Sequence, residues 1–225
     1  DEINIAVSKI KKKKFDITDI SSKVINRNPS GPFTTSTLQQ TASSRLGFGA
    51  SRTMQIAQKL YQGIEIEGET IGLITYMRTD GTNISNDAVS TFRDYIKKEI
   101  GNEYLPESPL NYSGKKAKNA QEAHEAIRPT DIVRTPQSIK KYLSPDQNKL
   151  YDLIWCRSLS SQMETAKFDR NTITITSDNN DTICKASGSV LKFDGFLKIY
   201  NSPNKDDDEN ILPEMSKGPV NLEAL

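Results

Sequence analysis

The sequence has few residues of the types that mark metal, disulfide and membrane proteins. Its 225 residues include two cysteines, one histidine and one tryptophan. Cys156 and Cys184 make neither a disulfide framework nor the paired spacing of a zinc site, so we expect free thiols in a reducing cytoplasm. No apolar run approaches the roughly 18 residues of a membrane span. No Asp-x-Asp-x-Glu cluster that could hold Mg²⁺ occurs, so no metal site is predicted in this chain.

An excess of charge of one sign is also missing. The chain carries 30 Lys and Arg against 29 Asp and Glu, for a formal net charge of +1. This balance does not indicate a nucleic-acid binder, so any such affinity has to come from a local arrangement. The first residue is Asp, there is no signal-peptide pattern, and the chain ends in Asn-Leu-Glu-Ala-Leu. We therefore expect a piece of a longer protein.

Strand patterns lie at both ends of the chain and helix patterns lie between them. Residues 1–28 alternate loosely and residues 172–176 alternate strictly, which predicts strands, and residues 182–200 are expected to continue them. Helices are predicted over about 36–46, 51–62 and 85–100, and again after Thr135 and Ser144. Ser36, Ser85 and Ser144 are the expected helix caps. The predicted fold class is α+β: residues 1–35 and 161–225 form a β-rich domain, and residues 36–160 form an inserted, mainly helical domain.

A polar cluster follows a short apolar run near the middle of the chain. Residues 72–75 predict a buried strand, which ends at Tyr76 and Arg78 and is followed by an Asp-Gly turn. Alternate residues of a strand share a face, so the two side chains can point the same way. A phenol beside a guanidinium suits attack on a phosphodiester. The phenolic oxygen is the nucleophile, and the guanidinium binds the phosphate oxygens as charge builds on them.

A second cluster of candidate residues follows a basic, loop-like segment. Lys115 and Lys116 lie in that segment, where they either follow a phosphate backbone or simply face solvent. Residues 120–127 predict a short helix that ends before Pro129. Gln121, His124 and Arg128 are spaced to share one face of it. His124, the lone histidine, is either structural or part of a phosphate site, and both interpretations stay open on the residues alone.

Three sequence blocks resemble the type IA DNA topoisomerases. They are Ile-Thr-Tyr-Met-Arg-Thr-Asp at 74–80, Pro-Phe-Thr-Thr-Ser-Thr-Leu-Gln-Gln at 32–40 and Ala-Gln-Glu-Ala-His-Glu-Ala-Ile-Arg-Pro-Thr at 120–130. All three occur in the family's order. Met77, directly after the tyrosine, is typical of the bacterial topoisomerase I branch. Gly81 departs from the many members that carry Ser, which removes a hydroxyl but not the nucleophile.

The resemblance implies a fold and a reaction. The β-rich domain would be an arch that carries the tyrosine domain at its far end. Tyr76 would cleave one strand and become joined to its 5′ phosphate. The other strand would pass through the gap, and resealing without ATP would relax negatively supercoiled DNA. Arg78 would stabilise the phosphate charge, and His124 and Arg128 would hold the scissile phosphate.

The resemblance also implies parts outside this chain. Mg²⁺ would be bound by an acidic cluster in a separate N-terminal domain, so the chain alone is expected not to relax DNA. The expected partners are that missing domain and a single-stranded segment of negatively supercoiled DNA. A monomer is expected, in the bacterial cytoplasm and associated with the nucleoid.

Three alternatives compete with this interpretation. In a non-catalytic single-stranded DNA-binding module, Tyr76 would stack on a base and Arg78 would bind a phosphate without any covalent step. In a structural arch, the chain would only hinge. Another type IA member, such as topoisomerase III or reverse gyrase, is the close enzymatic alternative, and Met77 favours topoisomerase I.

Overall fold

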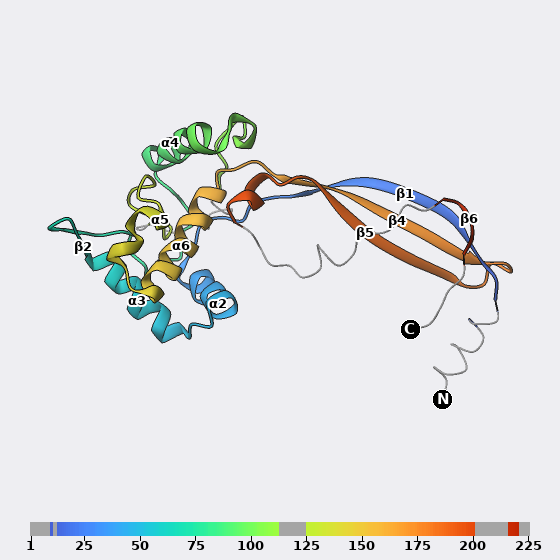
Figure 1. The fold of residues 1–225 in the computed structure, drawn as a ribbon, viewed down its shortest axis with the longest axis horizontal. Helices are drawn as coiled ribbons and strands as arrows, with labels where there is room; N and C mark the ends of the chain where they lie inside the picture. Colours follow the sequence, from blue (N-terminus) through green and yellow to red (C-terminus); the bar gives the residue numbers. More distant parts are fainter. Residues whose placement is uncertain (1–9, 11–12, 113–124, 201–215, 221–225) are drawn as a thin grey trace, which may run out of the picture. The chain divides into compact units, whose positions relative to one another are not determined.

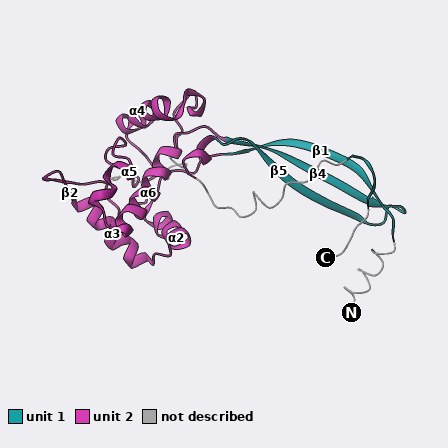
Figure 2. Cartoon of the chain, in the orientation of Figure 1, with its two compact units in different colours: residues 1–27, 166–194, 202–225 teal, residues 28–165, 195–201 magenta. Residues whose placement is uncertain are grey.

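The chain folds into two compact units. The structure is a computed structural model that describes residues 10, 13–112, 125–200 and 216–220 (Figure 1). Unit 1 comprises residues 1–27, 166–194 and 202–225, and unit 2 comprises residues 28–165 and 195–201 (Figure 2). The predicted α+β class is confirmed, with a four-stranded sheet in unit 1 and the helices named below, together with a short hairpin, in unit 2. The predicted domain limits of 1–35, 36–160 and 161–225 stay a prediction.

Unit 1 is an antiparallel sheet of four strands. Its order is β5 (Ile183–Phe193), β4 (Ala166–Ser177), β1 (Phe15–Arg27) and β6 (Gly218–Val220). β1 runs against β4 over its whole length, from Phe15 opposite Ser177 to Arg27 opposite Ala166. The two strands come from opposite ends of the sequence, so their pairing closes the long insertion that forms most of unit 2.

The hydrophobic core of unit 1 follows the predicted alternation. Ile173 and Ile175 are buried on one face of β4, and they pack with Phe15 and Ile17 of β1. The threonines between them remain partly exposed, as the period of two requires. The strict alternation at 172–176 therefore predicted both the strand and its buried face.

The prediction that strands continue to residue 200 is wrong. β5 ends at Phe193, and Gly195–Lys198 forms a short 3₁₀ helix, η4, that belongs to unit 2. Gly195 has φ +49°, and a Cβ there would lie 2.5 Å from the carbonyl oxygen of Glu164. The backbone turns because it buries Phe196 and Tyr200 against unit 2, where the N–H of Phe196 donates to Glu164 at 2.9 Å.

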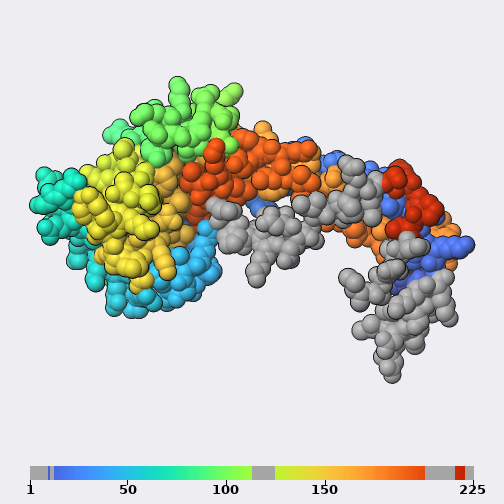
Figure 3. All heavy atoms as spheres, in the orientation of Figure 1, coloured from blue at the N-terminus to red at the C-terminus, as the bar shows by residue number. Residues whose placement is uncertain are grey.

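Unit 2 is a set of short helices around α6 (Pro145–Ser160). The others are α2 (Thr35–Leu46), α3 (Ala50–Gln62), α4 (Asn86–Tyr95), the π-helical η1 (Ile96–Ile100), η2 (Asn102–Tyr104), α5 (Pro136–Ile139) and η3 (Lys140–Tyr142), with a hairpin of β2 (Ile64–Ile66) and β3 (Glu69–Ile71). Side chains of α2, α4 and α6 form a continuous surface on the visible face of the unit (Figure 3). Beneath it, Leu150, Tyr151 and Ile154 of α6 are fully buried.

Helix caps show where local sequence was decisive. Ser85 and Ser144 accept hydrogen bonds from the N–H groups of Ala88 and Gln147, as predicted. The predicted cap Ser36 is wrong, because Thr34 caps α2 and forms a reciprocal pair with Thr37. The helix begins earlier than predicted since its first residue is held by backbone groups from another segment, described below.

Candidate active site around Tyr76 and Arg78

The regular strand predicted for residues 72–75 is wrong, because the backbone around Tyr76 bends at Thr75, Met77 and Arg78. Only one isolated bridge forms there, between Ile74 and Pro129. The N–H of Leu73 donates to the carbonyl of Leu60 at the end of α3 (2.8 Å), whereas the N–H of Thr75 donates to Arg128 (2.9 Å). Because successive backbone groups bond to different segments, no continuous strand ladder can form.

Side-chain burial alternates along this segment. Met77 is 1% exposed and Thr79 8%, whereas Tyr76 is 37% exposed and Arg78 also faces solvent. Tyr76 and Arg78 are thus both exposed, and the prediction that their side chains share one face stays a prediction. Their roles in a reaction stay predictions.

Thr35 fixes the backbone on both sides of Arg78. Its hydroxyl lies 2.8 Å from the carbonyl oxygen of Met77 and 3.0 Å from that of Thr79. The N–H of Thr79 donates back to the hydroxyl (2.8 Å), and the N–H of Thr35 donates to the carbonyl of Thr79 (2.9 Å). Each such bond contributes about 1 kcal/mol net. Thr35 lies in one of the three resembling blocks, yet sequence reasoning gave it no role.

Tyr61, at the end of α3, is a second residue that the sequence reasoning missed as a neighbour of the site. Its ring meets the Tyr76 ring edge-on, with centroids 5.4 Å apart and planes at 66°. This is a favourable aromatic geometry. The chain can approach α3 this closely because residue 72 is glycine: a Cβ there would lie 2.8 Å from the carbonyl oxygen of Tyr61. Backbone packing thus places one phenol beside the other.

The predicted helix at 120–127 is wrong for the residues that the structure describes. Residues 125–127 are extended, and residues 120–124 lie outside the described part. The N–H of Ala126 donates to the carbonyl of Asn83 (2.9 Å), and that of Ile127 donates to Phe33 (2.8 Å). These bonds to distant segments replace the bonds within one helix that the sequence pattern suggested.

Arg128 is held by its own neighbourhood. Its Nε and Nη2 lie 2.8 and 2.7 Å from one carboxylate oxygen of Glu125, and Nη1 donates to the carbonyl of Pro129 (3.0 Å). Its side chain is 14% exposed. The other carboxylate oxygen of Glu125 accepts the N–H of Ser85 (3.0 Å). The arrangement suits positioning, because the carbonyl of Arg128 also bonds the residue before Tyr76. Phosphate binding by Arg128 stays a prediction.

The other candidate residues are not described by the structure. Gln121, His124, Lys115 and Lys116 all lie within 113–124, outside the described residues. Their predicted roles in holding phosphate and in following the DNA backbone therefore stay predictions.

Arg78 lines a groove along the exposed side of α3. The groove has a volume of about 880 Å³, and it also contains Asp146 at the start of α6. The remaining lining comes from α3: Ser51, Arg52, Met54, Gln55, Ile56, Gln58, Lys59 and Gln62. Three cations thus face one carboxylate, a difference of 3 − 1 = +2. A positively lined groove beside an exposed tyrosine suits a polyanion.

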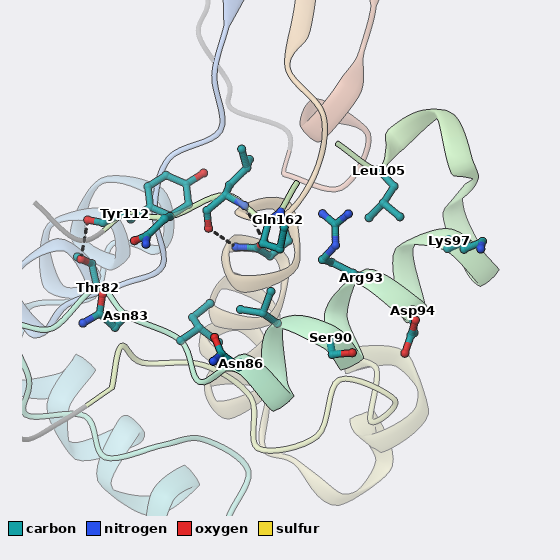
Figure 4. A pocket seen from close by; sticks show the side chains of 15 residues that line it. Thr82, Asn83, Asn86, Ser90, Arg93, Asp94, Lys97, Leu105, Tyr112 and Gln162 are labelled. Atoms are coloured by element: carbon teal, nitrogen blue, oxygen red, sulfur yellow. Dashed lines mark hydrogen bonds between the residues drawn. The ribbon is translucent and has the colours of Figure 1, made fainter. Parts of the chain in front are cut away.

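Two other hollows of unit 2 carry a smaller net charge, 0 in one and +1 in the other. One, of about 440 Å³, carries two cations and two carboxylates, Glu67, Glu69, Arg134 and Lys141. The other, of about 750 Å³, lies against α4 and holds Arg93, Asp94 and Lys97 (Figure 4). There Arg93 donates to the carbonyl of Pro106 (2.7 Å). Neither hollow is lined by Tyr76 or Arg78.

The described residues form neither a metal-binding cluster nor a membrane-spanning helix. No group of three or more His, Cys, Asp or Glu side chains there is arranged to hold a metal ion. In the same part of the chain, no helix is long and apolar enough to cross a bilayer.

Comparisons with known proteins agree with the site. A family model described as DNA topoisomerase matches residues 1–224. The DNA topoisomerase 1 of Rickettsia prowazekii is 52% identical over 212 residues, covering 93% of this chain and 27% of that protein. The DNA topoisomerase 1 of Haemophilus influenzae is 45% identical, covering 96% and 23%. Full-length topoisomerase I from Thermotoga maritima superposes with a TM-score of 0.79 at 35% identity, covering 96% of this chain and 34% of that one.

A helical unit inserted in the sequence between the strands of an antiparallel sheet is the fold of this part of a type IA topoisomerase, as the match to topoisomerase I of Thermotoga maritima shows. The chain belongs to the DNA topoisomerase family, since the family model matches nearly its whole length. The identification made from the three sequence blocks is thereby confirmed. The chain spans about a quarter of the length of the curated relatives that it matches, 27% and 23% of the two named above.

Proposed function

We propose that this chain carries the nucleophile of a type IA topoisomerase that cleaves one DNA strand, lets another pass and reseals the break. The observation that carries the proposal is the pairing of an exposed Tyr76 with an exposed Arg78 on a backbone that Thr35 fixes in place. The net effect would be relaxation of negatively supercoiled DNA, as in the enzymes for which the relatives are named.

The covalent step is an exchange of one phosphate ester for another. The phenolic oxygen of Tyr76 forms a bond to the backbone phosphorus, and the bond from phosphorus to the 3′ oxygen breaks. The phenol loses its proton, and the 3′ oxygen leaves with a proton. A 5′-phosphotyrosine results, which conserves the ester energy so that the reverse step needs no ATP. Arg78 would stabilise the charge that develops on the phosphate oxygens.

The remaining residues would position these two groups. Arg128 and Glu125 hold the strand of backbone next to Tyr76, as their contacts with Ser85, Thr75 and Pro129 indicate. His124 and Gln121 would contact the phosphate, and Lys115 and Lys116 would follow the DNA backbone. Mg²⁺ would stabilise phosphate charge when bound, at an acidic cluster outside this chain, as the family resemblance implies.

The proposed setting follows from the same family. The substrate is a single-stranded segment of negatively supercoiled DNA, and the partner is a metal-binding domain of the same protein. We place the protein in the bacterial cytoplasm with the nucleoid, as a monomer. Topoisomerase III and reverse gyrase are the alternatives within type IA, and Met77 favours topoisomerase I.

The decisive experiment removes a single oxygen atom. In a full-length enzyme that carries this chain, Tyr76→Phe should abolish covalent adducts with a labelled single-stranded oligonucleotide while leaving its DNA affinity nearly unchanged. Tyr142→Phe is the matched control, because its hydroxyl bonds Glu67 away from the site (2.9 Å), and it should form adducts at the normal level. Adducts that persist in Tyr76→Phe would overturn the proposal.

A second experiment tests whether this chain can relax DNA without the metal-binding domain. The 225-residue chain, incubated alone with negatively supercoiled plasmid and Mg²⁺, should leave the plasmid supercoiled on an agarose gel. Efficient relaxation would show that the metal chemistry resides in this chain.

A further inference from the structure

Helix α3 presents one polar stripe to solvent. Arg52, Gln55, Lys59 and Gln62 are exposed and follow one another at steps of three or four residues, so they lie on one face. The opposite face is buried through Thr53, Ile56, Ala57 and Leu60. The helix is therefore anchored by one side, and its other side forms the floor of the groove that Arg78 lines.

This groove begins beside the proposed nucleophile. Tyr61 touches Tyr76, the next residue, Gln62, lines the groove, and Arg78 lines it as well. From Gln62 back to Ser51 the helix rises about 16 Å at 1.5 Å per residue. That length accommodates about five nucleotides at the 3.4 Å spacing of a stacked strand.

The chemistry of the lining suits a nucleic-acid strand without sequence preference. Arg52 pairs with Asp146 at 2.5 Å, but both side chains are more than a third exposed, at 56% and 36%. Such an exposed pair is weak, so a phosphate group can compete for the arginine. Among the residues that the structure describes, Lys59 forms no ion pair, and the groove is also lined by three glutamine amides, which offer both donors and acceptors.

We infer that the α3 groove holds the DNA strand that remains attached to Tyr76 after cleavage. The inference rests on the proposed function. The attached strand starts at a phosphate fixed to unit 2 and must run over the surface of that unit, whereas the released 3′ end has no bond to it. The α3 groove lies next to the bond between Tyr76 and the DNA, and its lining has an excess of positive charge. It is therefore the surface on which the attached strand can bind. Holding this strand keeps the broken end in place for resealing.

Photocrosslinking tests the path directly. A full-length enzyme that carries this chain is trapped as its covalent adduct on an oligonucleotide with one photoreactive thymidine. The probe is placed either two to five nucleotides on the 3′ side of the cleaved bond or the same distance on the 5′ side. We expect the 3′-side probe to crosslink within residues 51–62 and the 5′-side probe to crosslink elsewhere. A 3′-side probe that labels only other segments would overturn the inference.

A charge variant measures the contribution of a single contact. Lys59→Gln should lower the slope of log K against log salt by about 0.7, the value for one phosphate contact on a single strand. The effect should occur with an oligonucleotide that extends on the 3′ side and vanish with one that lacks these nucleotides. Lys98→Gln is the matched control, since Lys98 is 83% exposed on η1 and lies outside the groove. Equal slopes for Lys59→Gln and the parent enzyme would contradict the inference.

Different results would contradict the proposed function and the inference about the α3 groove. Adducts in Tyr76→Phe would remove the proposed function and this inference together. Normal adducts from the parent enzyme, combined with crosslinks that avoid α3, would remove the inference and leave the function standing.

Discussion

The two units of this chain are stabilised by different means. In unit 1, the buried cluster is small, centred on Phe15, Ile17, Ile173 and Ile175. Several apolar side chains elsewhere on the sheet are exposed to solvent: Val24 is 60% exposed, Ile183 62% and Leu191 49%. In unit 2, by contrast, the large apolar side chains of α2, α3 and α6 are fully buried: Leu38, Leu60, Leu150 and Ile154.

The difference fits the function proposed above for the chain. A sheet is held along its length by backbone hydrogen bonds, so it tolerates exposed side chains and can serve as a long connector. A site that aligns a phenol with a guanidinium needs a backbone fixed within a fraction of an ångström, which only dense packing and satisfied polar groups provide. The segment that carries Tyr76 and Arg78 lies in unit 2, where its neighbours Leu73, Ile74 and Met77 are buried.

The largest difference between the units should appear on truncating one apolar side chain in each. Leu60→Ala should lower the free energy of unfolding by about 2–5 kcal/mol, because its side chain is fully buried and the substitution leaves a cavity. Val24→Ala should change it by less than about 0.5 kcal/mol, since Val24 is exposed. Urea unfolding monitored by circular dichroism measures both. Equal losses would refute the contrast between the units.

A smaller loss should follow from removing the hydroxyl that fixes the reactive segment. Thr35→Val leaves the N–H of Thr79 without the hydroxyl acceptor, at an expected cost of about 1–3 kcal/mol. It should also slow covalent adduct formation at temperatures where the protein remains folded. Thr91→Val is the control, since Thr91 is exposed and its hydroxyl bonds only within α4, and it should alter neither quantity. A normal adduct rate in Thr35→Val would show that other contacts suffice.

The aromatic pair should have a still smaller effect, and one confined to reactivity. Tyr61→Leu removes a ring contact of about 0.5–1.5 kcal/mol, which corresponds to a decrease of several-fold in the single-turnover rate of adduct formation. Tyr61→Phe should restore the rate, because the ring geometry does not use the hydroxyl. If Tyr61→Leu instead weakened DNA binding at an unchanged rate, Tyr61 would act as a stacking surface for a base.

Each unit also contains an ionisable group with a shifted pKa. These two shifts should make the stability of the protein depend on pH at acidic and at alkaline pH, respectively, and not near neutral pH. In unit 1, hydrogen bonds from Lys13 and Thr182 lower the pKa of Asp181. This contribution to stability is present above the unfolded pKa of about 4 and is lost as the pH falls toward the lower, folded value. In unit 2, burial raises the pKa of Cys156 to about 12. That contribution is complete below the unfolded pKa of about 8.5 and is lost as the pH rises toward 12.

Paired variants separate these two effects. Asp181→Asn should flatten the acid limb of a stability–pH curve, and Cys156→Ala should flatten only the alkaline limb. The curve is measured from unfolding midpoints at fixed ionic strength. A Cys156→Ala variant with the parent's alkaline limb would show that the buried thiol is not linked to stability there.

Much of the local structure could be predicted because its causes are near in sequence. The alternation at Ile173 and Ile175 produced the buried face of β4, and Ser85 and Ser144 cap the helices that follow them. Tyr76 and Arg78 are exposed and alternate with the buried Met77 and Thr79, although no regular strand forms. The family membership rested on the same short blocks of sequence.

The wrong predictions share one cause, which is competition from partners far along the chain. The sequence pattern predicts a helix that includes residues 125–127, but the N–H groups of Ala126 and Ile127 donate to the carbonyls of Asn83 and Phe33 instead. Thr34 rather than Ser36 caps α2 because Thr35 is bonded to the segment around Arg78. Gly195 starts a turn rather than continuing a strand, since Phe196 and Tyr200 are buried in unit 2.

The sequence by itself determined the α+β class, the buried face of β4 and the helix caps that depend on residues three positions away, because periodicity and capping act over a few residues. The tertiary structure alone decided that Thr35 bonds the backbone around Arg78, that Glu125 accepts the N–H of Ser85 and that the cations of α3 line the same groove as Arg78. Those contacts join segments separated by tens of residues, and no local pattern encodes which distant backbone group a hydrogen bond will find.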